Sequence, residues 1–237
     1  RTAPTNELTI TSDGDISLAE LVFEDGPYLD PQSDTGTVSA YTGSVTFTPV
    51  SSTFTANDVG RSIRLHSKPA AWASGTTYAQ GDNVTYNGEY WRSMLAGNIG
   101  VIPGTLNASN IMVWAPNPTA ASWAWGYITA QAGTTATVGI SSLSHDLQSA
   151  NCATIDSWRL GVYTVDNYPT CGVYYEGRFW LGGANPNRFD ASSSNDPNNF
   201  SPTDAYGNVT DAHAISATLN ADDLTDILWM AADHQGL

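Results

Sequence analysis

Hydrophobic and polar positions alternate along most of the chain, in short runs rich in Val, Thr, Tyr, Trp and Phe. Gly, Asn, Asp and Pro separate these runs. Alternation places successive side chains on opposite faces of a strand, and the separating residues are those that favour turns. No long stretch combines the three- and four-residue spacing of an amphipathic helix with helix caps. The pattern therefore predicts an all-β protein.

The clearest alternation lies in two segments that are far apart in the sequence. In residues 36–70, Val45 and Phe47 face one side of a predicted strand while the neighbouring Ser and Thr residues face the other. Residues 119–150 resume the same style with Trp- and Tyr-rich strands. We therefore predict one discontinuous β domain built from both segments. Before it, residues 1–35 are expected to form an irregular N-terminal arm with one short apolar piece.

Residues 71–118 differ in style from the segments on either side, and prolines bound them. Loops tolerate long insertions at a small entropic cost, so we interpret this stretch as a small β module inserted into one loop of the β domain. Asn87-Gly88 lies between two alternating runs. Because both positions of the favoured hairpin turn need a positive φ, this dipeptide predicts a tight hairpin.

The third part of the chain, residues 151–237, contains further short apolar runs that predict strands, separated by a long polar segment. Its last residues resemble the turn before another strand. A strand left without a partner exposes an edge, so we expect the natural protein to continue beyond residue 237.

Composition adds charge to this picture. The 237 residues contain 8 Lys and Arg against 23 Asp and Glu, which gives a net charge of −15. An acidic surface repels phosphate, so the composition argues against retention of nucleic acid and against adhesion to anionic lipid. No apolar run approaches the roughly 18–20 residues that a membrane helix needs, so no membrane span is expected. Cys152 and Cys171 leave two possibilities open, one disulfide bond or two free thiols.

Residues with catalytic chemistry are scattered. The four His residues lack metal-ligand spacing, and neither a nucleophile elbow nor a phosphate-binding glycine loop is present in the sequence. The adjacent carboxylates Glu24 and Asp25 would point to opposite sides of a strand, which does not build an acid/base pair. We expect no enzymatic activity, no cofactor and no metal. The Asp and Asn residues of 192–211 fit a solvated loop better than the close ligand spacing of a calcium loop.

The inserted stretch carries the most specific local pattern, a set of aromatic residues spaced around a Gly-Asp pair and the Asn-Gly turn. The set comprises Trp72, Tyr78, Gly81-Asp82, Val84, Tyr86, Asn87-Gly88, Tyr90-Trp91 and Trp114. Its spacing resembles that of the small chitin- and cellulose-binding modules of secreted glycosidases, in which sugar rings stack on exposed aromatic faces. The resemblance implies that Trp72, Tyr78, Trp91 and Trp114 are candidate glycan-stacking residues. The same rings would equally serve as the core of so small a module, and both roles stay open.

The sequence departs from those modules at one informative place. The modules usually carry a pair of exposed aromatic residues after the second hairpin strand, and this chain has Ser93, Met94, Leu95 and Ala96 there. The departure favours the core role over sugar binding.

A second resemblance covers most of residues 20–237 and lies in the order of several pieces. The pieces are Phe23–Tyr28, Asp58–Leu65, Tyr168-Pro169, Tyr175–Gly183, Asn199-Phe200 and Ile227–Trp229. Together they resemble phage tail nozzle (tail tubular) proteins, whose N-terminal β domain precedes a β-propeller. Asn167 departs from the pattern, since a Gly often precedes the Tyr-Pro pair. The resemblance implies that residues 151–237 begin a propeller-like domain of antiparallel strands that is incomplete here.

From this resemblance we expect a structural subunit, present as a fragment, of a phage or prophage tail nozzle in the virion. Such a subunit would self-associate into a ring, contact neighbouring tail and portal-side proteins, and let DNA pass without binding it specifically. The inserted module would lie outside, where it braces neighbours or contacts host-surface glycans. The alternative is a secreted non-catalytic carbohydrate-binding protein, or an accessory piece of a glycosidase.

Overall fold

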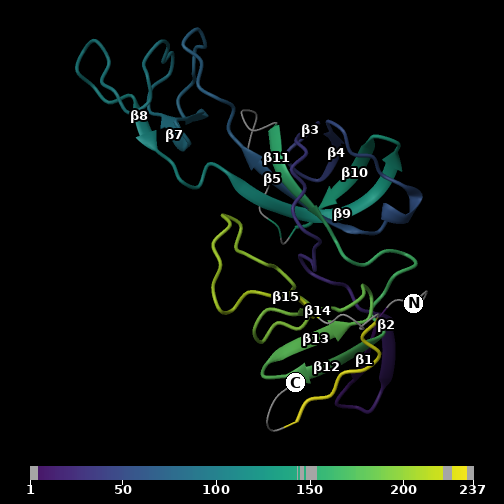
Figure 1. The fold of residues 1–237 in the computed structure, drawn as a ribbon. Helices are drawn as coiled ribbons and strands as arrows, with labels where there is room; N and C mark the ends of the chain where they lie inside the picture. The colour runs from purple at the N-terminus through teal and green to yellow at the C-terminus, as the bar shows by residue number, and fades with distance from the viewer. Residues whose placement is uncertain (1–4, 143, 145–146, 148–153, 221–225, 234–237) are drawn as a thin grey trace.

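The computed structural model describes residues 5–142, 144, 147, 154–220 and 226–233. It confirms the all-β prediction, because apart from the 3₁₀ turn η1 (Ala56–Asp58) every regular element in these residues is a strand. Figure 1 shows a barrel in the middle, an insert that extends from one end of it, and a separate sheet at the other end. Helices long and apolar enough to cross a membrane are absent from the part of the chain that the structure describes.

The barrel is closed and has six strands in the order β10-β4-β3-β11-β5-β9, and every neighbouring pair is antiparallel. The strands are β3 (Gly36–Val38), β4 (Ser44–Pro49), β5 (Ser62–Lys68), β9 (Ser122–Ala132), β10 (Thr135–Ile140) and β11 (Thr154–Leu160). Segments 36–70 and 119–150 of the sequence therefore do share one sheet.

The last barrel strand lies after residue 151, where the sequence pattern placed the start of the third part. β11 pairs with β3 on one side and with β5 on the other, and its Trp158 lies opposite Leu65. The sequence analysis predicts strands in this part of the chain from its short apolar runs, without the bounds of β11. It did not reveal the sheet that the strand joins, because both partners are far away in the sequence.

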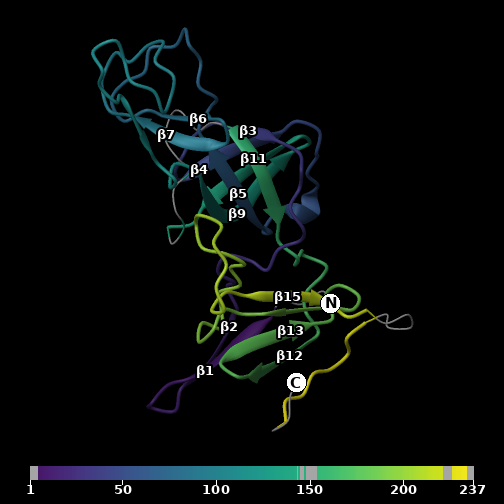
Figure 2. The same cartoon turned by 60° about the vertical axis from the view of Figure 1, so that its left-hand side comes forward.

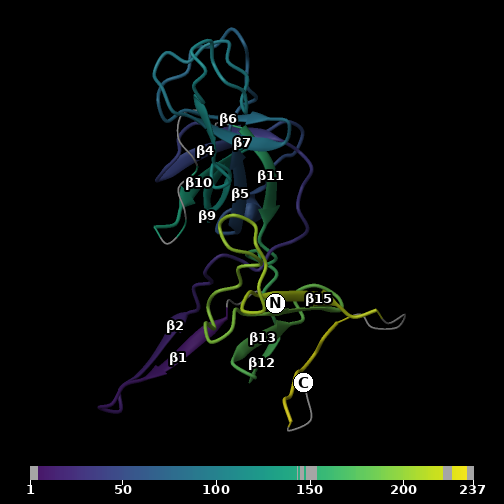
Figure 3. The same cartoon turned by 90° about the vertical axis from the view of Figure 1, so that its left-hand side faces the viewer.

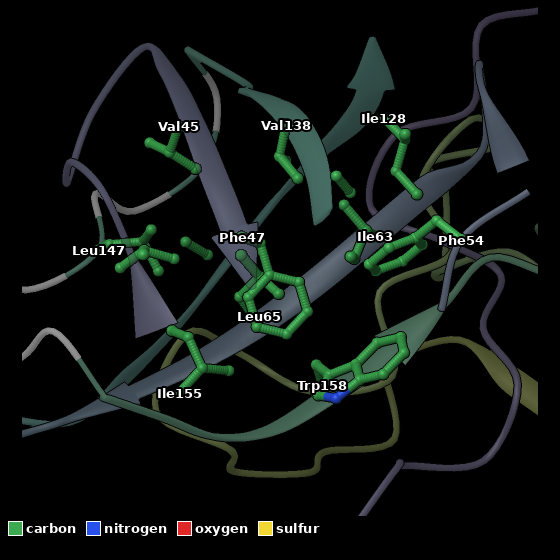
Figure 4. Close-up of a cluster of buried hydrophobic side chains, with 13 residues drawn as sticks. Val45, Phe47, Phe54, Ile63, Leu65, Ile128, Val138, Leu147, Ile155 and Trp158 are labelled. Atoms are coloured by element: carbon green, nitrogen blue, oxygen red, sulfur yellow. The ribbon is translucent and has the colours of Figure 1, made fainter. Parts of the chain in front are cut away.

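The barrel interior is filled by aliphatic and aromatic side chains from all its strands (Figure 4). Val45 and Phe47, which the alternation assigns to one face, are fully buried together with Ile63 and Leu65. Trp158 closes one side of this core, with its ring 5.4 Å from that of Phe47 and tilted by 69°, a favourable edge-to-face arrangement.

The insert has a sheet and a core of its own. β6 (Asn83–Tyr86), β7 (Glu89–Ser93) and β8 (Trp114–Pro116) form an antiparallel three-stranded sheet. The turn between β6 and β7 confirms the hairpin prediction, since Asn87 and Gly88 both have positive φ (51° and 81°). The insert leaves the barrel after β5 and returns at β9, where Ser67 and Ser122 are paired, so it occupies one loop.

The N-terminal arm is not irregular, and this prediction was wrong. β1 (Asn6–Ile10) and β2 (Ile16–Glu20) form an antiparallel hairpin that projects from the rest of the molecule in Figure 3. The turn uses Gly14 at φ 86°, and the Gly14 N–H donates a hydrogen bond to the Thr11 carbonyl. A Gly with positive φ between two alternating aliphatic pairs is the ordinary hairpin signal.

The C-terminal part forms one four-stranded antiparallel sheet in the order β12-β13-β14-β15. Its strands are β12 (Cys171–Tyr175), β13 (Arg178–Gly182), β14 (Arg188–Ala191) and β15 (Ile215–Thr218). The antiparallel prediction is confirmed, whereas a propeller needs several such sheets around an axis and is not shown. Cys171 carries a free thiol, and Cys152 lies outside the described residues.

Candidate functional site

A buried polar joint connects the N-terminal arm, the barrel and the C-terminal part. Asp25, Tyr28 and Arg64 meet there, and all three residues are buried. The Tyr28 hydroxyl donates a hydrogen bond to Asp25 Oδ1 (2.8 Å), and Arg64 Nε lies 3.5 Å from the same oxygen. Burial raises the pKa of Tyr28 well above its usual value, and the charge of Asp25 adds to this effect. Tyr28 is therefore a hydrogen-bond donor at any physiological pH.

Arg64 also contacts the C-terminal part of the chain. Its Nη2 donates hydrogen bonds of 2.9 Å to the carbonyls of Thr203 and Asp204. Its guanidinium carbon lies 5.2 Å from the ring centroid of Trp123 on β9, within cation–π range. Alternation along β5 places Arg64 on the outer face of the barrel, where the segment around residue 203 covers it.

The arm and the C-terminal part also touch through their backbones. The Glu24 N–H donates to the Asn198 carbonyl (2.7 Å), and the Phe200 N–H donates to the Glu24 carbonyl (2.9 Å). Gly26 follows at φ 125°, and a Cβ on it would lie 2.5 Å from the Phe200 carbonyl oxygen. Only glycine permits this approach, since any side chain would collide with the backbone.

A second ion pair supports the same joint. Arg188 on β14 pairs with Asp190 (2.8 Å between Nη2 and Oδ1), and its Nη2 also donates to the Tyr28 carbonyl (2.6 Å). Nearby Tyr163 has a pKa raised well above its usual value by burial and by the charge of Asp190. The sequence pieces Phe23–Tyr28, Asp58–Leu65 and Asn199-Phe200, which carry the second resemblance, thus lie together in the fold.

An open cleft of about 400 Å³ lies over this joint. Its lining includes Glu24, Trp123, Asp196, Asp204 and His213. Asp204 accepts hydrogen bonds from the backbone N–H groups of its own turn and from Asn208, and these bonds lower its pKa. No group of three His, Cys, Asp or Glu residues in the described ranges is arranged to hold a metal ion.

A close His–Asp pair lies on the outer face of the barrel. His66 Nδ1 on β5 is 2.6 Å from Asp156 Oδ1 on β11, and Lys68 Nζ is 3.0 Å from Asp156 Oδ2. Burial alone raises the pKa of Asp156, but the hydrogen bonds from His66 and Lys68 outweigh it and hold the pKa below its usual value. The His66 ring packs against Trp123 at 5.0 Å. This geometry cross-links β5, β9 and β11.

In the insert, the structure excludes two of the four candidate glycan-stacking residues. Trp114 is fully buried, and its indole N–H donates to the Val101 carbonyl (2.8 Å). Tyr78 is 7% exposed and packs edge-to-face on Trp114, with 5.2 Å between ring centroids. Neither ring offers a face to a sugar, because a domain this small needs both for its core.

Trp72 and Trp91 are half-buried and pack against that core. The Trp72 ring meets Tyr86 edge-to-face at 5.6 Å. The Trp91 ring lies against Gly104, where an added Cβ would be 3.3 Å from its Cη2 atom. Both indole nitrogens are buried without a hydrogen-bond partner. These two residues are the remaining candidates for sugar contact.

Residues 94–112 of the insert expose several large apolar side chains, which the sequence analysis did not predict. Seven apolar side chains are exposed there: Met94, Leu95, Ile99, Ile102, Leu106, Ile111 and Met112. The available signal was the absence of any charged residue between Arg92 and Asp146 in a chain of net charge −15.

Comparison of the chain with protein-family models and with curated proteins finds no match.

Proposed function

We propose that the chain is a structural subunit of a phage or prophage tail nozzle, located in the virion, and that it has no enzymatic activity. The observation that carries this proposal is the buried joint of Asp25, Tyr28 and Arg64. The charged residues of the nozzle-like sequence pieces connect the barrel to the C-terminal part, since Arg64 contacts both Asp25 and the backbone of Thr203 and Asp204. A subunit that transmits load between tail components needs such a joint.

Charge supports the role of a DNA conduit. Proteins hold DNA by releasing its counterions with Lys and Arg, and this chain has 8 of them against 23 Asp and Glu. A conduit lined by a surface of this composition lets the phosphate backbone of DNA pass without retaining it. The four-stranded C-terminal sheet has the strand number of one propeller blade. In this proposal the sheet is the first blade of a propeller, and the other blades belong to the rest of the parent protein.

The insert would lie on the outside of the nozzle and brace neighbouring tail or portal-side proteins. Its exposed aliphatic side chains, such as Ile99 and Met112, suit contact with protein. The alternative function, a carbohydrate-binding protein or glycosidase accessory piece, rests on the half-buried rings of Trp72 and Trp91.

Immunogold labelling tests the proposed location. Antibodies raised against the chain are applied to particles released from cells that carry its gene. We expect gold at the tail, below the capsid, and no retention of double-stranded DNA by the purified chain at moderate salt. Unlabelled particles together with label in the secreted fraction would contradict the nozzle and favour the alternative. Reproducible hydrolysis of chitin, cellulose, peptidoglycan or ester substrates would contradict the absence of activity.

A further inference from the structure

A polar pocket of about 320 Å³ lies between the barrel and the C-terminal sheet. Figure 2 shows β15 as the strand of that sheet that faces the barrel, with β11 ending above it. The pocket is lined by Arg159 from β11, Arg188 from β14, Ser216 and Thr218 from β15, and Asp30 from the N-terminal arm. Two of the chain's 8 Lys and Arg residues therefore line one small pocket.

The charge of Arg159 lacks a carboxylate in contact with it. Its side chain is half-buried, and among the described residues it makes no hydrogen bond and no ion pair. Its guanidinium carbon lies 5.8 Å from the ring centroid of Trp123. Burial and the charge of Arg64 lower the pKa of Arg159, and the more distant charge of Asp30 only partly opposes them. Buried arginine charges are as a rule paired, so this one lacks an expected partner.

The strand register adds to this deficit. Arg159 lies directly opposite Arg64 in the pairing of β11 with β5, and like charges at opposite positions destabilise a sheet. Arg64 is compensated by Asp25, at 3.5 Å, whereas Arg159 faces the pocket. An anion bound in the pocket would supply the partner that Arg159 lacks.

Arg188 offers further donors to the same pocket. Its Nε and Nη2 donate hydrogen bonds to Asp190, and Nη2 also donates to the Tyr28 carbonyl. Its Nη1, with two N–H groups, makes no hydrogen bond to any residue that the structure describes. Guanidinium N–H groups bind oxyanions through short, charge-assisted hydrogen bonds. The two arginines therefore form an anion site.

The other polar groups of the pocket indicate which anion fits. Asp30 is an exposed carboxylate that repels an anion unless the ligand also brings hydroxyl donors to it. Ser216 already donates its hydroxyl to Asp190 (2.6 Å) and so presents an acceptor, while the Thr218 hydroxyl can donate or accept. A ligand with one carboxylate and several hydroxyl groups satisfies all of these residues.

Size and charge narrow the class further. The pocket volume lies at the lower end of the range of ligand sites, which suits a molecule of about the size of a monosaccharide. The chain has a net charge of −15, and its repulsion of a ligand grows with the ligand's negative charge. A singly charged carboxylate is therefore favoured over a phosphate.

We propose that this pocket binds a small hydroxylated monocarboxylate of the sugar-acid class. Its carboxylate contacts Arg159 and Arg188, and its hydroxyl groups contact Asp30 and Thr218. The site goes beyond the proposed structural role and does not depend on it. It is also separate from the aromatic residues of the insert, none of which lines this pocket.

NMR titration of the ¹⁵N-labelled full chain with D-glucuronate at constant ionic strength tests the proposal. The backbone amide signals of Ser216, Ala217 and Thr218 and the Nε–H signal of Arg159 report on the pocket. We expect them to shift with a dissociation constant in the millimolar range, because a small ligand in an open pocket forms few contacts. Glucose, which lacks the carboxylate, and acetate, which lacks the hydroxyl groups, should each bind about tenfold more weakly or worse. Phosphate should bind no more tightly than acetate.

Three variants locate the site. Arg159→Gln should weaken glucuronate binding about tenfold or more, since it removes charge-assisted hydrogen bonds. Because Arg159 takes part in no ion pair with a described residue, the amide spectrum of this variant should show an intact fold. Arg92→Gln, at an exposed position of β7, is the matched control and should bind as the wild type does. Asp30→Ala should strengthen acetate binding and lower the preference for glucuronate over acetate, since it removes both the repulsion and the acceptor for hydroxyl groups.

The site would be overturned by an unchanged affinity in Arg159→Gln, or by pocket signals that glucuronate does not shift at any concentration. Equal affinities for glucuronate and glucose would overturn the role of the arginines. Equal affinities for glucuronate and acetate, or tighter binding of phosphate, would overturn the sugar-acid class. None of these outcomes affects the labelling of particles, so the proposed function is tested separately.

Discussion

Arg64 and Asp25 form a buried ion pair across the joint, with 3.5 Å between Arg64 Nε and Asp25 Oδ1 and exposed fractions of 2% and 7%. Each charge depends on the other, because removing one partner of a largely buried ion pair leaves the other charge uncompensated. Arg64 also reaches the backbone of Thr203 and Asp204, so the pair ties three distant parts of the sequence together.

Replacing Arg64 with Met should lower the free energy of unfolding by about 3–5 kcal/mol, since it leaves the Asp25 carboxylate buried without its cation. Denaturant titration followed by circular dichroism measures the loss. Arg92→Met is the matched control, because Arg92 is exposed on β7 of the insert. A loss no larger than that of the control would contradict the importance of the joint.

Gly26→Ala should destabilise the protein by about 1–3 kcal/mol from backbone strain alone, because its φ of 125° suits only glycine. The new methyl group would also displace the Phe200 carbonyl, which lies 2.5 Å from the Cβ position. Gly75→Ala is the control, since nothing lies within 4 Å of its Cβ position and its φ is not positive. Equal melting temperatures for the two variants would refute this account.

The pH dependence of stability should include a contribution from Asp156. Its pKa in the folded chain lies below the ordinary 3.8, so the carboxylate stabilises the fold above that value. This stabilisation is lost as the pH falls through the lower folded pKa. In Asp156→Asn the contribution is absent, so the difference in unfolding free energy between wild type and variant should shrink from about pH 5 downward. Asp13→Asn, in the exposed turn of the hairpin, serves as the control. A difference that stays constant down to about pH 2 would argue against the ion cluster.

Replacing residues 71–118 with a short Gly-Ser linker should leave the barrel folded. β5 and β9 pair directly up to Ser67 and Ser122, so their ends are already adjacent without the insert. Loop length changes stability by only about 0.6 kcal/mol per doubling. A single cooperative unfolding transition of the shortened chain is the expected observation. Loss of cooperativity would mean that barrel and insert share a core.

Titration of the chain with chitin and cellulose oligomers, followed by NMR, should give weak or no binding. One or two stacked rings contribute about 0.5–1.5 kcal/mol each, which corresponds to millimolar affinity at best. Any binding should be lost in Trp72→Ala or Trp91→Ala, while the spectrum of the barrel stays unchanged. Micromolar binding that either variant abolishes would favour the carbohydrate-binding alternative.

Much of the strand pattern could be predicted from the sequence. Val45 and Phe47 alternate with polar neighbours, and the structure buries both in the barrel. Asn87-Gly88 specifies its turn because few dipeptides accept two positive φ angles. The β1–β2 hairpin was equally available from Gly14 and the aliphatic pairs around it, although the prediction missed it.

Whether a candidate side chain is available to a ligand depends on its burial, and the local sequence pattern does not reveal burial. Tyr78 and Trp114 have the spacing of a sugar platform, but the insert is too small to fold without them inside. Arg64 alternates with Ile63 and Leu65 as an outward-facing residue does, yet it is buried.

The clearest strands, such as the one that carries Val45 and Phe47, and the Asn87-Gly88 turn follow from the sequence alone, because alternation and turn chemistry are properties of a few adjacent residues. The closure of the barrel by β11 and the cover of Arg64 by the segment around Thr203 become visible only in the folded chain. Both contacts join segments far apart in the chain. Their free energy comes from surfaces that meet only after folding, so no local pattern encodes them.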